Sequence, residues 1–304
     1  MVTRRKPYIS IIIVSDNRLP HLKACLAALQ NLDNAEFVIV NNLASTAMMQ
    51  TLETYLDQLA DPRILFYQSK ISLTKNHARN LGFNFASGSW LYFINDYDQL
   101  TVKFINFLNH YKLDPRIHFY RLQLTSQNQS KTKFNWFKTK YYSHDISTFL
   151  MNAETTFNQF KFQFEDYLTF CDALPLISRL YNIKNVNYQP LKHFYALNHN
   201  FDCALGSASD PEVDDSIMAI FQLLLKRKHH WYKQFILLLI ACIYREFCCI
   251  TKPNHRFYLA KIKTMTHRAK IWCWHYWLLG IGFACKTWRL RWRLVFTAVN
   301  HKKT

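Results

Sequence analysis

Two aspartates separated by a single residue follow a run of apolar residues. Asp96 and Asp98 come directly after residues 90–94, which have the composition of a buried strand. Closely spaced carboxylates can hold a divalent cation, because Mg²⁺ and Mn²⁺ prefer hard oxygen ligands. The same spacing also suits a solvated turn, so these residues alone leave both interpretations open.

Polar residues also end two earlier apolar runs, at residues 8–15 and 36–40. The polar residues at these ends are Ser15, Asp16, Asn17, Asn41 and Asn42. The carboxyl ends of parallel strands meet at one edge of a sheet, and ligands bind at that edge. We therefore expect these side chains and Asp96 to line one crevice.

The spacing of apolar residues predicts the elements that position this crevice. Strands are expected over 8–15, 36–40, 63–69 and 90–96. Helices are expected between them over 19–32, 45–59 and 73–88, with Ser45 as an N-cap and Gly88 as a C-cap. Continuous apolar strands separated by helices indicate an α/β fold, a Rossmann-like and mostly parallel sheet with helices on both faces.

Later residues give a weaker pattern. A strand is expected over 117–125, and a segment over 160–182 is expected to become helical at Glu165 and Asp166. Two acids in a first helical turn interact favourably with the helix dipole, so this pair has a structural explanation as well as a chemical one. A strand over 185–197 would return across the crevice and bring His193 there as a possible third metal ligand.

Charge is distributed unevenly along the chain. Residues 216–304 contain 17 Lys and Arg against one acid, whereas the whole chain has 38 against 20. Residues 207–215 contain Pro211 and several acids, which is typical of a linker. The sequence therefore predicts a first domain over 1–206, a linker over 207–215, and a helical, basic, Trp-rich region over 216–304.

The basic region has two open interpretations. Its apolar runs, at 235–244 and 271–285, are shorter than the roughly 20 residues of a membrane-spanning helix. Trp, Lys and Arg around the second run are typical of a helix lying on an anionic membrane surface. The alternative is a helical subdomain that packs against the sheet and exposes a basic face.

Composition also bears on the cellular compartment and on whether the protein binds nucleic acid. The eight cysteines show no metal-ligand spacing, which indicates reduced thiols in a reducing compartment. No secretory signal is evident, so a cytoplasmic location is expected. A nucleic-acid binder would explain the basic balance, but no RNP, KH or zinc pattern accompanies it. We expect no nucleic-acid partner.

Four segments in register resemble the family 2 glycosyltransferases, which have the GT-A fold. Residues 9–29 resemble that family's first strand and helix, and residues 37–45 resemble its second strand end. The most similar segment is 76–96, whose matching residues are Ala78, Arg79, Asn80, Gly82, Ala86 and Gly88. Glu165 and Asp166 resemble the family's ED pair. The resemblance covers about residues 8–200 and is specific because all four segments occur in order.

The resemblance implies inverting transfer of a sugar from a nucleotide-sugar donor, UDP-linked by default, to an acceptor hydroxyl. Asp166 would be the catalytic base, with Glu165 as the alternative. The donor-binding residues would be Ser15, Asp16, Asn17, Asn41, Asn42, Arg79 and Asp96. A Mn²⁺ or Mg²⁺ ion would lie on Asp96 and Asp98. The implied partner is a glycan or lipid-linked acceptor of surface polysaccharide, lipopolysaccharide or capsule, with the enzyme peripheral on the inner face of the plasma membrane.

Some positions depart from the family pattern. Asn95 and Tyr97 occupy the places of the family's two metal-site aspartates, so the acids here are displaced by one residue. Asn41 and Asn42 replace acids that contact the nucleotide base. These departures support an alternative, a GT-A domain that binds its ligand without catalysing transfer and acts as a partner of another transferase.

Overall fold

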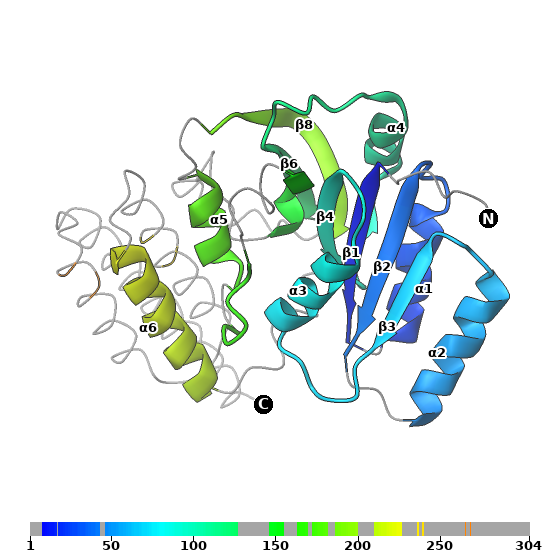
Figure 1. The fold of residues 1–304 in the computed structure, drawn as a ribbon, viewed down its shortest axis with the longest axis horizontal. Helices are drawn as coiled ribbons and strands as arrows, with labels where there is room; N and C mark the ends of the chain where they lie inside the picture. The colour runs from blue at the N-terminus through cyan, green and yellow to red at the C-terminus, as the bar shows by residue number, and fades with distance from the viewer. Residues whose placement is uncertain are drawn as a thin grey trace, which may run out of the picture. The chain divides into compact units, whose positions relative to one another are not determined.

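The computed structural model describes residues 8–16, 18–42, 46–126, 146–154, 163–169, 172–181, 186–199 and 210–226, and the single positions 236, 239, 265 and 268. Asn17, the expected N-cap Ser45 and nearly all of the basic region beyond residue 226 therefore lie outside the described residues. The chain divides into two compact units, residues 1–239 and 240–304. The elements labelled in Figure 1 belong to the first unit.

The described residues contain eight strands and six α-helices. The strands are β1 (Ile9–Ser15), β2 (Ala35–Asn41), β3 (Ile64–Gln68), β4 (Trp90–Asn95), β5 (Gln99–Leu100), β6 (Phe119–Ser126), β7 (Phe149–Asn152) and β8 (Tyr188–His199). The helices are α1 (Leu19–Leu29), α2 (Thr46–Leu59), α3 (Lys75–Phe85), α4 (Val102–His110), α5 (Leu174–Tyr181) and α6 (Asp210–Lys226). The expected strands and helices of the first hundred residues are confirmed to within a few residues at each end.

All strands join one sheet in the order β3-β2-β1-β4-β7-β6-β8-β5. The first four strands are parallel to one another, whereas β7 is antiparallel to both β4 and β6. The chain passes outwards from β1 to β2 and β3 and then crosses back to the other side of β1 to form β4. The sheet thus has a topological switch point between the carboxyl ends of β1 and β4, where ligands bind in open α/β sheets.

Alternate residues of the central strands pack against different helices. On β1, Ile9, Ile11 and Ile13 lie in a large core cluster that also contains residues of α1 and α4. Val14 lies on the other face, in a cluster with Val40 of β2 and Ala78 of α3. Both faces are covered because every second side chain of a strand points to the same side. Figure 1 shows α3 crossing one face of the sheet and α1 lying behind it. The expected mostly parallel sheet with helices on both faces is confirmed.

The expected glycine C-cap at Gly88 is wrong. Helix α3 ends at Phe85, and its C-cap is Ala86 in an extended conformation. Gly88 is instead required by a close approach of two backbones: a Cβ there would lie 2.6 Å from the Ser10 nitrogen and 2.8 Å from the Ile9 carbonyl carbon. Its own amide donates to Ser10 Oγ and to a carboxylate oxygen of Glu36.

The described residues correct the expected helix start at Glu165 and add a helix to part of the predicted linker. Glu165 and Asp166 lie in a turn, not in a first helical turn, and the helix after them, α5, begins at Leu174. The predicted linker overlaps the start of α6, since residues 210–215 are helical, whereas residues 207–209 lie outside the described residues. The domain boundaries themselves stay a prediction.

We predict that Gly88→Ala lowers the free energy of unfolding by about 2 kcal/mol, because the backbone of β1 would have to move to admit a methyl group. Gly82→Ala is the matched comparison. Its Cβ would meet the side-chain methyl Cγ2 of Ile12 at 2.5 Å, and the better helix propensity of alanine would offset part of the loss by about 1 kcal/mol. Urea unfolding should show the larger loss for Gly88→Ala, and equal stability of that variant and the wild type would contradict the prediction.

Candidate functional site

The carboxyl ends of β1 and β4 meet through hydrogen bonds to one carboxylate. The Ser15 hydroxyl donates to Asp96 Oδ2 at 2.9 Å, and the Asp16 backbone amide donates to the same oxygen at 3.1 Å. The backbone amide of Asn42, just past the end of β2, donates to the Ser15 carbonyl. The structure therefore brings these residues to one edge of the sheet, at the switch point.

Asp96 combines deep burial with an unused acceptor. Its side chain is 1% exposed, and Oδ1 has no hydrogen-bond partner among the described residues. Burial raises the pKa of this carboxyl above its ordinary value, because the charged form is poorly solvated there. A buried acceptor without a partner costs stability, and such atoms occur where a ligand or ion completes the site.

Asp98 has different neighbours. Its Oδ2 accepts hydrogen bonds from the backbone amide of Asn95 at 2.9 Å and from the Asn95 side-chain amide at 3.0 Å. Its own amide donates to the Asn95 carbonyl, which closes a tight turn directly after β4. Asp98 thus stabilises the turn that directs the chain away from the sheet.

A divalent cation fits this edge only in part. The unpartnered Oδ1 of Asp96 suits a hard cation, whereas Asp98 Oδ2 is used by Asn95. Within the described ranges, no three His, Cys, Asp or Glu side chains gather closely enough to form a metal site. The side chain of His193 lies outside the described residues, although its backbone is in β8. Of the two acids after β4, Asp96 is therefore the one whose side chain has a buried, unpartnered oxygen for a cation.

The two asparagines at the carboxyl end of β2 are hydrogen-bonded to the segments beside them. Asn41 Nδ2 donates to Gln68 Oε1 on β3. Asn42 accepts from the Leu73 amide at 2.7 Å and donates to the Leu73 carbonyl at 2.9 Å. Asn42 thereby fixes the loop that leads into α3.

Arg79 is buried and holds a loop. Its Nη1 donates to Asp172 Oδ2 at 2.8 Å and to Asn76 Oδ1 at 2.9 Å, and its guanidinium carbon lies 5.5 Å from the centre of the Phe164 ring. Asn76 is fully buried and donates to the carbonyls of Glu165 and Asp172. Arg79 thus contacts both ends of the loop between Phe164 and Asp172. Its contact with a donor stays a prediction.

Asp166 is held at the first turns of α3. Thr74, the N-cap, donates to the Asp166 carbonyl and accepts from the His77 amide. Asn80 donates to Asp166 Oδ1 and exchanges two hydrogen bonds with the backbone of Phe164. His77 Nδ1 lies 3.4 Å from Asp166 Oδ2, so both carboxylate oxygens face side chains of α3. The carboxylate nevertheless stays half exposed and accessible.

Glu165 and Tyr167 flank Asp166 and face different surroundings. Glu165 forms an ion pair with Arg179 of α5 at 2.7 Å. The Leu168 amide donates to the Glu165 carbonyl, so Asp166 and Tyr167 occupy the centre of a turn. Tyr167 is 58% exposed, an unusual placement for a large aromatic side chain.

The sequence named Asp166 as a candidate base, which stays a prediction, but it did not indicate the residues that hold Asp166. Asn76 and His77 belong to the segment that resembles the family, yet their partners are about 90 positions away in the sequence. Asp172 and Arg179 have no local pattern that distinguishes them from surface charges. Asn80 is one of the residues in 76–96 that match the family, so the sequence did single it out, but its contact with Asp166 was not expected.

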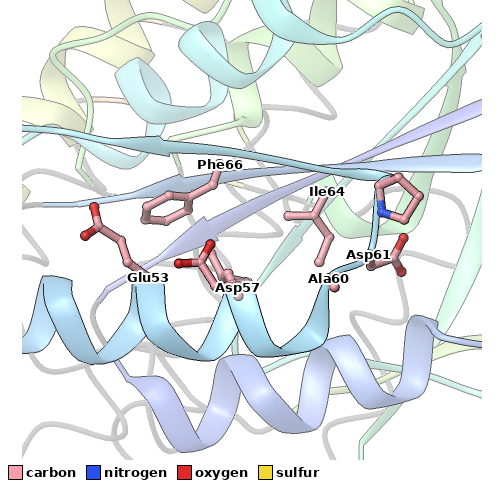
Figure 2. A pocket seen from close by; sticks show the side chains of 8 residues that line it. Glu53, Asp57, Ala60, Asp61, Ile64 and Phe66 are labelled. Atoms are coloured by element: carbon pink, nitrogen blue, oxygen red, sulfur yellow. The ribbon is translucent and has the colours of Figure 1, made fainter.

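The described residues also form a pocket between α2 and β3, which is the strand at one end of the sheet (Figure 2). Carboxylates of Glu53, Asp57 and Asp61 line it together with Ile64 and Phe66. None of these residues belongs to the edge around Asp96. Three acids disfavour an anionic ligand such as a diphosphate, so this pocket is not the candidate site.

The fold and the site define an open α/β protein whose expected ligand edge lies at a topological switch point. Residues 10–153 match the model of the Glycosyl transferase family 2. This match covers just under half of the chain, and it shows that residues 10–153 are similar to the glycosyltransferases of that family. No curated protein sequence matches the chain.

Solved structures share the fold at low sequence identity. The S. aureus protein TarS, residues 1–349 in complex with UDP-GlcNAc, has a TM-score of 0.63 and 13% identity over 85% of this chain and 80% of that chain. The Pyrobaculum calidifontis mannosyltransferase PcManGT, in complex with GDP-Man and Mn²⁺, has a TM-score of 0.51 and 10% identity over 90% and 84%. The likeness confirms the expected GT-A fold. The described helices include none that is both long and apolar enough to cross a bilayer.

We predict that Asp96→Asn raises the free energy of unfolding by about 1 kcal/mol at pH 7.5 in EDTA, because a neutral amide avoids the burial of a charge and keeps the acceptor for Ser15 and Asp16. A raised carboxyl pKa means that the folded state favours the protonated form. The advantage of the variant should therefore shrink as the pH falls and Asp96 of the wild type becomes protonated.

Asp61→Asn is the control of opposite sign, since hydrogen bonds from Arg63 lower the pKa of Asp61. This variant should lose stability at pH 7.5 in the same urea titrations. A loss of stability in Asp96→Asn comparable to that in Asp61→Asn would show that the Asp96 carboxylate is structurally required.

Proposed function

We propose that the protein transfers a sugar from a nucleotide-sugar donor to an acceptor hydroxyl with inversion at the anomeric carbon. The observation that carries this proposal is the accessible carboxylate of Asp166, fixed by α3 beside the strand edge that contains Asp96. Parallel strands and the helices that follow them place strand carboxyl ends and helix N-termini at the same edge. The start of α3 and the end of β4 therefore lie at the same edge of the sheet.

The donor would bind along the ends of β1, β2 and β4. Asp96 Oδ1 is the acceptor that a ribose hydroxyl or a cation would use, and Ser15, Asp16, Asn41 and Asn42 lie at the same edge. A UDP-sugar is the default donor, which the UDP-GlcNAc complex of TarS supports; PcManGT, with GDP-Man, makes a guanosine donor the alternative.

A Mn²⁺ or Mg²⁺ ion would be held by Asp96 and by donor oxygens, with Asp98 contributing only if its turn opens. When bound, such an ion neutralises the negative charge that develops on a departing diphosphate. Arg79 and Asp172 form a pair with little net charge, so Arg79 would affect the donor chiefly through the loop that it holds.

Asp166 would accept the proton of the acceptor hydroxyl as that oxygen attacks the anomeric carbon from the side opposite the diphosphate. The exposed ring of Tyr167, next to it in the same turn, offers an apolar face on which a sugar of a glycan acceptor can pack. This juxtaposition supports a carbohydrate acceptor, as in the synthesis of surface polysaccharide, lipopolysaccharide or capsule.

The alternative is a GT-A domain that binds a nucleotide sugar without transferring it. The displaced acids at the end of β4 and the engagement of Asp98 by Asn95 favour it. The orderly placement of Asp166 favours an active enzyme, because three side chains of α3 position this turn.

For residues 216–304 we propose attachment to the anionic cytoplasmic face of a membrane without crossing it. The 17 basic residues against one acid would attract anionic headgroups, and the tryptophans would lie at the headgroup level. An enzyme with a lipid-linked acceptor would gain access to its substrate in this way.

Asp166→Asn should retain donor binding and lose transfer by about 100-fold or more, because the amide cannot accept a proton. Transfer to glycan acceptors from UDP-, GDP-, CMP- and dTDP-sugars, each with Mn²⁺ and with EDTA, is the measurement. Glu165→Gln is the matched control and should keep activity, since Glu165 is paired with Arg179. Donor binding without transfer by the wild type would establish the alternative.

Replacing Arg289, Arg291 and Arg293 by Gln should weaken binding to phosphatidylserine-containing vesicles by roughly 100-fold, at about 1 kcal/mol for each charge. Replacing the exposed Lys70, Lys103 and Lys112 of the first unit by Gln is the control of equal charge. Sedimentation with the vesicles should fall for the arginine variant and not for the lysine variant. High salt should lower the sedimentation of the wild type as well. A wild-type protein that ignores these vesicles would contradict membrane attachment.

A further inference from the structure

The imidazole of His77 is placed against the carboxylate that the proposed reaction uses. Its Nδ1 lies 3.4 Å from Asp166 Oδ2, while Asn80 donates to the other oxygen, Oδ1. The side chain of His77 is 45% exposed and that of Asp166 is 51% exposed, so both members of the pair reach water.

The helix fixes this arrangement. Thr74, His77 and Asn80 follow one another at three-residue spacing, which places them on one face of α3. The Thr74 hydroxyl accepts from the His77 amide and donates to the Asp166 carbonyl, so the backbones of both partners are held by the same side chain. The same hydrogen bonds that hold the loop against α3 therefore place the imidazole beside the carboxylate.

We propose that His77 and Asp166 form a dyad in which His77 takes over the proton that Asp166 removes from the acceptor. This inference rests on the proposed function and concerns the regulation of the same site by proton release. His77 acts through Asp166 and is thus a positioning and relay residue.

The proton transfers balance in three steps. The acceptor O–H bond breaks as the oxygen bonds to the anomeric carbon, the bond to the diphosphate breaks with its electron pair, and Asp166 Oδ2 takes the proton. The carboxylic O–H then gives this proton to Nδ1 of a His77 that carries its other hydrogen on Nε2. The imidazolium beside the regenerated carboxylate finally releases the Nε2 proton to water.

Neighbouring charged groups have other partners. On α3 itself, Lys75 lies over the Tyr97 ring and Arg79 pairs with Asp172. From the loop and α5, Glu165 pairs with Arg179. Asp166 is the acid that the structure places against His77.

The dyad predicts a pH dependence. The acid limb of the kcat profile, which is the fall in kcat at low pH, should depend on the imidazole, because a protonated imidazole cannot take a further proton. This limb should therefore differ between the wild type and His77→Gln, which can still hydrogen-bond Asp166 but cannot relay a proton.

The test compares His77→Ala, His77→Gln and the control Lys75→Ala in the full-length protein, using the donor and acceptor that the wild type turns over. His77→Ala should lower kcat by about 10-fold with an unchanged KM for the donor, and added imidazole should restore most of the loss. Lys75→Ala should behave as the wild type. Circular dichroism would verify that each variant is folded.

A His77→Ala enzyme with wild-type kcat and an unchanged pH profile would overturn the dyad while Asp166→Asn still abolishes transfer. A loss that imidazole does not restore, with the acid limb unchanged in His77→Gln, would assign His77 a structural role and also overturn it. If the wild type transfers no sugar from any donor, the proposed function fails and the dyad fails with it.

Discussion

The placement of the acidic turn by α3 is the interaction on which the candidate site depends. The turn around Asp166 has no regular secondary structure, so its carbonyls need partners from elsewhere. Thr74, Asn76 and Asn80 provide them, and Arg79 holds Asp172 at the other end of the loop. Removal of a buried member such as Asn76 would leave carbonyls of both Glu165 and Asp172 without these donors.

Helix α3 also connects this turn to the strand edge. It packs on β1 and β2 through Ala78 and through Gly82, whose lack of a side chain lets the helix approach Ile12. Asn42, just beyond β2, holds Leu73 immediately before the helix begins. Helix α3 thus relates the positions of Asp96 and Asp166. It holds the turn that contains Asp166, and it packs on β1, whose carboxyl end is hydrogen-bonded to Asp96.

The parts of the fold that could be predicted from sequence are those that local patterns determine. The strands β1, β2 and β4 are mostly apolar and buried along their whole length because both faces of the parallel sheet are covered, and their ends were predicted closely. The supposed helix start at Glu165 and the supposed cap at Gly88 failed for a shared reason. Acids before an apolar segment resemble a helix N-terminus and glycine resembles a cap, but contacts with α3 and with β1, far away in the sequence, determine both positions.

The mutual dependence of α3 and the acidic turn has a consequence for how the enzyme can be altered. Transplanting residues 163–172 alone into a related scaffold would separate the turn from Thr74, Asn76 and Asn80, and the recipient helix would have to supply equivalent groups at the same three positions. The two segments constitute one module for recombination although about 90 residues separate them in the sequence. Chimeras that exchange residues 73–80 and 163–172 together should fold more often than chimeras that exchange either one.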